Sequence, residues 1–355
     1  MRRLLYFFLI LLILVAGAIY IALYQPYQGF PAGGVYVDIP HGASQRTIAR
    51  LLAENGVVRS RIGFEALCRA RRRPLEAGEY FFDHPVTSFE VFDALANGRV
   101  FVKELVVPEG FTIFDIADLV ASEGFITRDE FLAAARDPSL IRDLAPGVSS
   151  LEGFLFPATY EFPRHATAKD MTAAMVKRFR QVWSGLPFTD APATHSTVRD
   201  VVTLASLVER ETPRPEERPH VAGVFTNRLR LGQPLQCDPT VAYALTLAGK
   251  YTGKLDGEDL RFASPYNTYH KSGLPPGPIA NPGQASLQAA IAPSPTDDLY
   301  FVANTEGGHF FSKTLEEHNQ NVARYRRLLG ESQTQSSGNA ASATTLNKSR
   351  PVRSP

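Results

Sequence analysis

The first 24 residues constrain this chain more than any other part of its sequence. Two arginines precede an uncharged run from Leu4 to Tyr24. As a helix, such a run is about 31 Å long and matches the hydrocarbon core of a bilayer. We therefore expect a single transmembrane anchor at residues 4–24. The alternative is a cleaved signal peptide, because Ala16-Gly17-Ala18 resembles a cleavage site. The apolar residues Ile19 to Leu23 follow without a break and favour retention.

The charges that flank this run predict its orientation. Arg2 and Arg3 stand on its N-terminal side, and positive charges beside a membrane span prefer the cytoplasm. The N-terminus is therefore expected in the cytoplasm, with the chain beyond the span outside it. We expect a single-pass protein of the cell (inner) membrane whose functional part is extracytoplasmic, in the periplasm.

Length and composition exclude some classes of protein. A chain of 355 residues exceeds the usual single core, so two domains plus extra segments are expected. Lys and Arg number 37 against 36 Asp and Glu, for a net charge of +1, which argues against nucleic-acid binding. The one dense basic run contains Arg69, Arg71, Arg72 and Arg73. We expect a solvated helix end there; the alternative is a contact with anionic wall polymer or lipid headgroups.

Several common kinds of site are missing from the sequence. The only cysteines, Cys68 and Cys237, fall in different expected domains, so a disulfide between them would not be the framework of the fold. The histidines show no HExxH or other ligand spacing, so neither a metal nor another cofactor is expected. GxSxG, Walker A and GxGxxG motifs are also absent, which argues against the common serine hydrolases and nucleotide enzymes.

Residues 35–165 contain a degenerate repeat. The segment YVDIPHGASQRTIARLLAENGVV aligns with ELVVPEGFTIFDIADLVASEGFI. Each copy reads as a short strand, a Pro-x-Gly turn and a helix capped by Ser44 or Thr112, and a further strand and helix follow each. The pattern resembles the LysM-like subdomain of bacterial wall enzymes, which implies that the region holds the N-acetyl sugars of glycan chains. The alternative is a structural spacer between the membrane and the rest of the chain.

The character of the sequence changes at residue 168. Long amphipathic helical patterns follow, joined by Pro-rich loops. The strand pattern LYFVA, the turn at residues 306–308 and the segment HFF predict a hairpin, and Thr314 with Glu317 predicts a capping box on the last helix. Residues 331–355 are rich in Ser, Thr, Asn and Gln and are expected to be a disordered tail. The fold class is therefore α+β: an anchor, strand-helix modules, and a mainly helical domain at residues 168–330 with a hairpin.

The segment VVTLASLVERETP, Val201 to Pro213, carries a carboxylate on the apolar face of an expected helix. That carboxylate is Glu209, whereas Glu211 points to roughly the opposite side. Apolar surroundings and the helix C-terminus both favour the protonated form of a carboxyl group. Glu209 is therefore a candidate general acid. The alternative is a structural ion pair with an arginine such as Arg228.

Three loops beyond this helix carry polar and aromatic side chains. An aromatic face with paired donors and acceptors suits a sugar ring, and the prolines of the second loop reduce the cost of ordering it. The candidate substrate-binding residues are Gln236, Asp238, Tyr266, Asn267, Thr268, Tyr269 and His309. The alternatives are a helix N-cap for Asp238 and a turn with a satisfied amide for Asn267.

Five long motifs occur in a fixed order: LEGFLFPATYEF, LASLVERET, RLRLGQPLQCDPTVAYAL, SPYNTYHKSGLPPGPIANPG and LYFVANTEGGHFFSKTLEEHN. They resemble the endolytic murein transglycosylases, the YceG-like family, over residues 35–330, and the N-terminal anchor fits as well. The resemblance implies that the first glutamate of the E-x-E-T motif, Glu209, is the catalytic acid. Arg210, Pro234 and Cys237 depart from residues frequent in the family, but no departure removes a carboxylate.

The resemblance implies a membrane-anchored lyase that cleaves the β-1,4 bond between N-acetylmuramic acid and N-acetylglucosamine within nascent peptidoglycan glycan strands. Glu209 would protonate the leaving oxygen and then accept the proton of the substrate's C6 hydroxyl, which closes a 1,6-anhydro ring and ends the strand. It also implies peptidoglycan synthases as partners at the membrane. Two alternatives stay open: a muramidase that uses Glu209 with Asp238 and water, and a peptidoglycan-binding scaffold for wall synthases.

Overall fold

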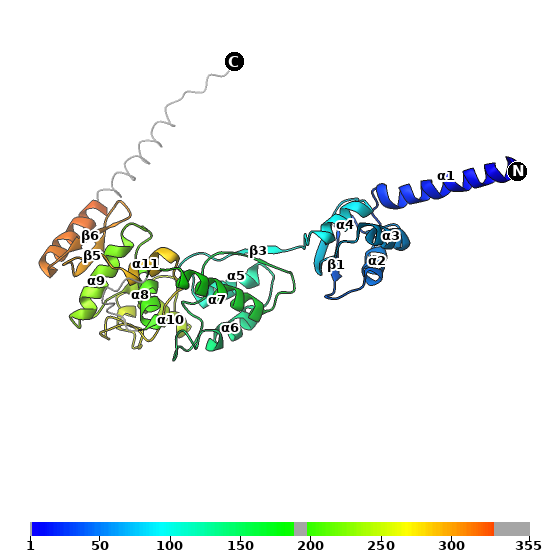
Figure 1. The fold of residues 1–355 in the computed structure, drawn as a ribbon. Helices are drawn as coiled ribbons and strands as arrows, with labels where there is room; N and C mark the ends of the chain where they lie inside the picture. The colour runs from blue at the N-terminus through cyan, green and yellow to red at the C-terminus, as the bar shows by residue number, and fades with distance from the viewer. Residues whose placement is uncertain (1, 188–196, 330–355) are drawn as a thin grey trace, which may run out of the picture. The chain divides into compact units, whose positions relative to one another are not determined.

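The computed structural model describes residues 2–187 and 197–329, and the chain divides into two compact units (Figure 1). Unit 1 comprises residues 1–103 with 161–164, and unit 2 comprises residues 104–160 with 165–355. Most of the described chain is helical, and its strands form two-stranded sheets. The expected α+β class is therefore confirmed. The tail expected at residues 331–355 lies outside the described residues.

Unit 1 joins one long apolar helix to a small strand-helix fold. Its helices are α1 (Arg2–Tyr24), α2 (Gln45–Glu54), α3 (Arg61–Arg71) and α4 (Ser88–Ala96). Strands β1 (Val35–Ile39) and β2 (Gly78–Phe82) pair antiparallel, with Val35 opposite Phe82. The core between helices and strands includes the fully buried side chains of Phe64, Tyr80 and Phe92.

Among the described residues, α1 is the one helix long and apolar enough to cross a membrane. It has 23 residues and a mean hydropathy of 2.8 in its most apolar window, and none of that window is buried. The apolar helix expected from the sequence is therefore present. Its length and composition fit a membrane anchor or a signal sequence.

The two copies of the sequence repeat fold alike. Ser44 accepts a hydrogen bond from the backbone of Thr47 and Thr112 from that of Asp115, both at 3.1 Å, so both expected N-caps are confirmed. After each helix the chain turns at a glycine with positive φ, 69° at residue 56 and 70° at residue 124. In the second copy, β3 (Lys103–Val106) pairs with β4 (Thr159–Phe162).

Unit 2 is built mainly from helices. They are α5 (Ile113–Ser122), α6 (Arg128–Ala135), α7 (Ala168–Ser184), α8 (Val198–Glu211), α9 (Arg218–Arg230), α10 (Asp238–Leu247), α11 (Gln284–Ile291) and a last helix at 315–329. Strands β5 (Tyr300–Ala303) and β6 (His309–Ser312) form the expected hairpin. The expected capping box of the last helix is confirmed, because Thr314 and Glu317 exchange two hydrogen bonds, each of 3.2 Å.

The helix α8 lies at the centre of unit 2. It packs against α9, α10 and α11, and every residue from Val201 to Val208 is buried. Thr197 caps its N-terminus by accepting from the backbone of Asp200. A helix that is buried on all sides has no single apolar stripe. The two glutamates at its C-terminal end follow this buried stretch, and each lies in different surroundings.

Candidate active site

A cavity of about 680 Å³ lies at the C-terminal end of α8 in unit 2. Polar side chains reach it from four segments: Glu211 ends α8, Gln236 and Asp238 stand where α10 begins, Tyr269 belongs to the loop after α10, and His309 begins β6. The other lining residues are Arg228, Leu235, Phe301, Val302, Ala303, His318 and Arg326. The lining is mainly polar and charged, and its apolar part comes from Leu235 and from residues 301–303 of β5. Polar groups that converge on one hollow from several segments are typical of a ligand site.

Glu211 is the carboxylate that α8 presents to this cavity. Burial raises the pKa of Glu211 from 4.5 to about 7. An interaction with Cys237 and the charge of Arg228 oppose this rise, while the charge of Asp238 adds to it. A carboxyl group with such a pKa keeps a proton in a large fraction of molecules at neutral pH, so it can act as a general acid.

Asp238 is the second carboxylate of the cavity, and it is exposed. The sequence interpretation that Asp238 caps a helix is wrong, because Asp238 is the first residue of α10 and Cys237 occupies the cap position. The hydroxyl of Tyr269 donates a hydrogen bond to Asp238. Burial, together with this bonded carboxylate, raises the pKa of Tyr269. The phenol therefore stays protonated and fixes the orientation of Asp238.

The loop before α10 is held in an unusual conformation. Gln236 has a φ of 53°, in the left-handed region that side-chain-bearing residues rarely adopt. Arg228, which is 8% exposed, stabilises the loop by donating to the carbonyl oxygens of Pro234 at 3.1 Å and Leu235 at 2.9 Å. The backbone N–H of Gln236 donates to Thr268. A strained backbone that its surroundings hold in place is common at functional sites.

His309 enters the cavity with one ring nitrogen already bound. Its Nδ1 lies 2.7 Å from Oε2 of Glu217, and its backbone N–H donates to Oε1 of the same carboxylate at 3.1 Å. Burial opposes ionisation of Glu217, but these hydrogen bonds outweigh it and lower the pKa of Glu217. The carboxylate is therefore charged and holds the imidazole in one orientation.

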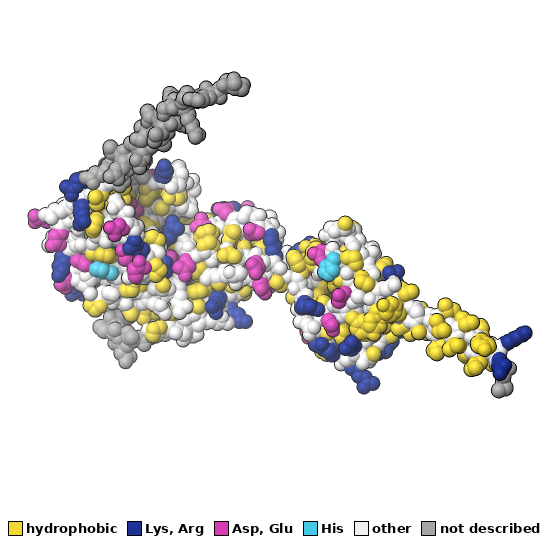
Figure 2. All heavy atoms as spheres, turned by 90° about the horizontal axis from the view of Figure 1, so that it is seen from above, with side chains coloured by type: hydrophobic (Ala, Val, Ile, Leu, Met, Phe, Trp, Pro, Cys, Tyr) yellow, Lys and Arg dark blue, Asp and Glu magenta, His cyan; other side chains and the backbone are white. Residues whose placement is uncertain are grey.

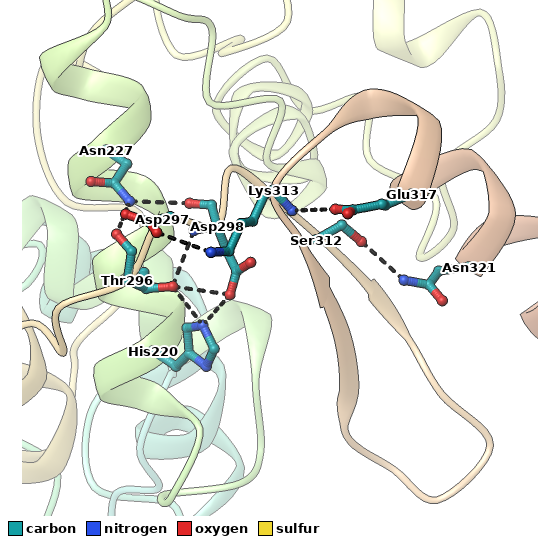
Figure 3. Close-up of polar contacts among 9 residues, drawn as sticks. All are labelled: His220, Asn227, Thr296, Asp297, Asp298, Ser312, Lys313, Glu317 and Asn321. Atoms are coloured by element: carbon teal, nitrogen blue, oxygen red, sulfur yellow. Dashed lines mark hydrogen bonds and ion pairs between the residues drawn. The ribbon is translucent and has the colours of Figure 1, made fainter.

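The hairpin that carries His309 is tied to α9 by polar contacts (Figure 3). Nε2 of His220 lies 2.8 Å from Oδ2 of Asp298. Asn227 donates to the carbonyl oxygens of Thr296 at 2.8 Å and Asp298 at 3.1 Å. Asn321 of the last helix donates to Ser312 at the end of β6. These bonds fix the hairpin against the helices on which the rest of the cavity is built.

The other three candidates of the YNTY segment lie beneath the cavity and are not among its lining residues. Asn267 is fully buried and donates to the carbonyl oxygens of Leu260 and Phe262. Thr268 accepts from the backbone of Cys237 at 3.0 Å. Tyr266 packs its ring 5.1 Å from that of Tyr243. All three hold the loop that presents Tyr269.

Glu209 lies outside the set of cavity-lining residues, in a buried ion pair. Its side chain is 5% exposed; Arg218 donates to Oε1 at 2.8 Å and the backbone of Gly283 donates to Oε2 at 2.9 Å. Burial raises the pKa of Glu209, and the bonds from Gly283 and Arg218 counteract the rise. The sequence named Arg228 as a possible partner, which is wrong, because Arg218 fills that place.

Sequence reasoning missed four polar residues of this site. Helical periodicity turns Glu211 away from the expected apolar stripe, and Glu217 and Arg326 lie outside the five motifs. His318 lies in the last motif, but no spacing to another residue marks it as a site residue. Within residues 2–187 and 197–329, no cluster of His, Cys, Asp or Glu side chains is placed to hold a metal ion. The chemistry that the arrangement allows is proton transfer to and from a bound polar ligand.

Comparison with known proteins gives consistent matches. The model of the YceG-like family matches residues 37–324. An endolytic murein transglycosylase of Bacillus subtilis (strain 168) is 33% identical over 321 residues, 86% of this chain and 88% of that protein. One from Streptococcus pneumoniae is 31% identical over 82% of this chain, which spans 58% of that longer protein. The crystal structure of a yceG-like protein from Listeria monocytogenes covers 81% of this chain and 98% of its own, with a TM-score of 0.53 and 34% identity.

Proposed function

The chain belongs to the YceG-like family, and from this premise we propose that it is a membrane-anchored endolytic lytic transglycosylase. It cleaves the β-1,4 bond between N-acetylmuramic acid and N-acetylglucosamine within nascent peptidoglycan strands. The products carry 1,6-anhydro ends, which terminate elongation of the strand. The observation that carries the proposal is the cavity at the end of α8, where a carboxyl group with a pKa of about 7 meets Gln236, Tyr269 and His309.

The reaction needs only one carboxyl group. In its acid form, the group donates a proton to the glycosidic oxygen that leaves with N-acetylglucosamine, and the bond from C1 to that oxygen breaks. The C6 hydroxyl of N-acetylmuramic acid then attacks C1 and gives its proton to the carboxylate, so the acid is regenerated and no water is consumed. Because the nucleophile belongs to the same sugar, its effective concentration is high.

The cavity geometry favours Glu211 as this acid. Glu211 lines the cavity, where a glycan strand can reach it, and its pKa lies near neutrality. Glu209 holds Arg218 on one carboxylate oxygen and Gly283 on the other, so a proton there would displace a buried hydrogen bond. The assignment of the acid to Glu209, which the sequence suggested, stays a prediction that the paired variants below test.

The other cavity residues serve as substrate contacts in this proposal. Tyr269 offers an aromatic face, and Gln236 and Asp238 offer donors and acceptors to sugar hydroxyl and acetamido groups. His309, held by Glu217, contributes its second ring nitrogen. Asn267, Thr268 and Tyr266 support the loop beneath them, and direct sugar contacts from these three remain a prediction.

A muramidase is the second candidate function, because Asp238 lines the same cavity as Glu211. If two protein carboxylates face one bound sugar, one can act as the acid while the other activates water, which gives a hydrolysed reducing end. Mass spectrometry of digested glycan strands separates the two reactions, since an anhydro end is lighter by one water. We expect anhydro ends in the wild-type digest. A digest with only hydrolysed ends would refute the lyase and support the muramidase.

The same digest distinguishes the enzyme from a wall-binding scaffold that has no catalytic activity. If the wild-type chain retains strands but releases no fragments, the enzyme proposal fails.

We further propose that α1 is a retained anchor with the N-terminus in the cytoplasm and that the strand-helix modules hold glycan in the manner of LysM units. Wall synthases are proposed as partners, since the substrate is newly made strand. Expression of a tagged chain and recovery of α1 in the membrane fraction test the anchor.

A further inference from the structure

The end of α1 packs directly on the rest of unit 1. The hydroxyl of Ser88 in α4 donates to the carbonyl oxygen of Ala22 at 2.9 Å, and the rings of Tyr24 and Phe89 lie 4.8 Å apart. A Cβ at Gly63 in α3 would sit 3.4 Å from Cβ of Ala22. The last two turns of α1 therefore hold the first turns of α3 and α4. If α1 spans a bilayer, α3 begins at the depth of its headgroup region.

The surface of α3 beside this contact is unusually basic. Between residues 59 and 73 the sequence has six arginines and one acidic residue, in a chain whose net charge is +1. The acidic residue, Glu65, is buried and bridged by Arg61 at 3.3 Å and Arg69 at 3.2 Å. Arg59, Arg71 and Arg72 are exposed and add further charge. Figure 2 shows basic side chains of unit 1 close to a hydrophobic area that continues into the anchor.

Apolar and aromatic groups accompany these charges. Ile62 is 74% exposed and precedes Gly63, the residue that meets the anchor. The guanidinium of Arg71 lies over the ring of Phe89, which in turn contacts Tyr24. Aromatic rings, long basic side chains and an exposed isoleucine at the end of an apolar helix are the composition of a membrane interface.

We propose that the interfacial patch, formed by Arg59, Arg61, Ile62, Arg69, Arg71 and Arg72, lies on the bilayer and binds anionic phospholipid headgroups. Ile62 enters the boundary of the acyl chains, and the guanidinium groups pair with phosphate oxygens. The inference rests on the proposed anchor and goes beyond the proposed catalysis. It means that unit 1 contacts the membrane surface in one fixed orientation and is not connected to the membrane through α1 alone.

Lipid-borne quenchers can test the patch on the full-length chain. We would introduce a single surface cysteine by Ile62→Cys or, as a control, by Arg99→Cys. Arg99 follows the C-terminal end of α4, whereas its N-terminal end meets the anchor. The native Cys68 and Cys237 are buried, so a fluorophore labels the introduced thiol. Each chain is placed in nanodiscs of phosphatidylcholine with or without phosphatidylglycerol, which contain lipids with a nitroxide near the headgroup.

We expect strong quenching at position 62, stronger with phosphatidylglycerol and weaker at high salt, and little quenching at position 99. In the triple variant Arg59→Glu, Arg71→Glu and Arg72→Glu, most of the additional quenching at position 62 that phosphatidylglycerol causes should be lost. This variant leaves the arginines around Glu65 in place, and circular dichroism checks its fold. Arg99→Glu, which reverses one charge elsewhere, should change nothing.

Equal quenching at the two positions, or quenching at position 62 that ignores lipid charge and salt, would overturn the patch. A chain that does not enter nanodiscs would overturn the anchor and the patch together. Glycan cleavage by the same samples is measured separately. A catalytically dead chain with normal quenching would refute the enzyme proposal while leaving the patch intact.

Discussion

The two glutamates at the end of α8 are two residues apart and lie in opposite surroundings. Glu209 is enclosed, with one carboxylate oxygen on Arg218 and the other on Gly283. Glu211 is half-buried and faces a cavity that holds Asp238, Tyr269 and His309. Burial raises the pKa of both groups. A raised pKa is therefore a poor guide to catalysis by itself.

The difference lies in what remains free to react. A general acid must bring its proton within hydrogen-bond reach of the substrate. At Glu209 both oxygens already accept from donors inside the protein, whereas Glu211 borders a space of about 680 Å³. Glu209 bonds α8 to the start of α9 and to the chain before α11, and Glu211 lines the cavity. In the proposed function, the first glutamate is structural and the second is the acid.

Replacing each glutamate in turn by glutamine should reveal the difference between them most clearly. We expect Glu211→Gln to lower kcat for glycan cleavage by about 10²- to 10⁴-fold, because the amide cannot donate the proton. Glu209→Gln should retain most of the activity, since its amide oxygen can still accept from Arg218 and only the bond from Gly283 is lost. Release of anhydro fragments from purified strands gives both rates. A dead Glu209→Gln enzyme with native stability, beside an active Glu211→Gln, would reverse the assignment.

Removal of the partner of Glu209 should affect folding more than chemistry. Arg218 and Glu209 are 6% and 5% exposed, and Arg218→Met leaves a buried carboxylate without its cation. We expect a loss of about 3–5 kcal/mol in the free energy of unfolding, measured by urea titration at neutral pH. The double variant Arg218→Met with Glu209→Gln should recover much of the loss. Equal stability of the wild type and Arg218→Met would mean that the pair has no structural role.

Changes of pH should alter both catalysis and stability through the protonation of Glu211. The catalytic form is protonated, so kcat/KM should fall about tenfold per pH unit above the pKa of about 7. Folding raises this pKa from 4.5, so the protonated form stabilises the fold; that stabilisation is complete below pH 4.5 and disappears as the pH rises through 7.

The Glu211→Gln variant supplies the control for this pH dependence. Its free energy of unfolding should fall less between pH 4.5 and 8 than that of the wild type, because one of the shifted groups is gone. The buried Glu152, whose pKa rises to about 8 through burial, still contributes in both proteins. Identical stability profiles would show that Glu211 is fully ionised in the fold and would remove the support for its role as an acid.

Local features of this fold could be predicted from the sequence because short-range contacts determine them. Ser44, Thr112 and Thr197 cap helices by bonding to a backbone three residues ahead. The hairpin from β5 to β6 follows from two apolar strands around a glycine-containing turn. Such interactions need no knowledge of the rest of the molecule.

The site itself depended on contacts between distant residues. Asp238 has the sequence of an N-cap, yet its carboxylate accepts from Tyr269, 31 positions further along the chain. Periodicity separated Glu209 from Glu211 but could not tell which of the two faces a cavity, because α8 is buried on every side. Arg218 could not be distinguished from Arg228 as a partner until α9 was placed against α8.

Removal of the Tyr269 hydroxyl should lower activity, but by less than the change at Glu211. Tyr269→Phe deletes the donor that orients Asp238 but keeps the aromatic face. A hydrogen bond of this kind contributes about 1 kcal/mol, so kcat/KM should fall by roughly 3- to 10-fold. The matched control is Tyr266→Phe, because Tyr266 packs on Tyr243 and lies outside the cavity-lining set. If Tyr266→Phe lowers kcat/KM as much as Tyr269→Phe does, then the substrate also contacts the buried side of the loop. The cavity next to Glu211 would then be only part of the binding site.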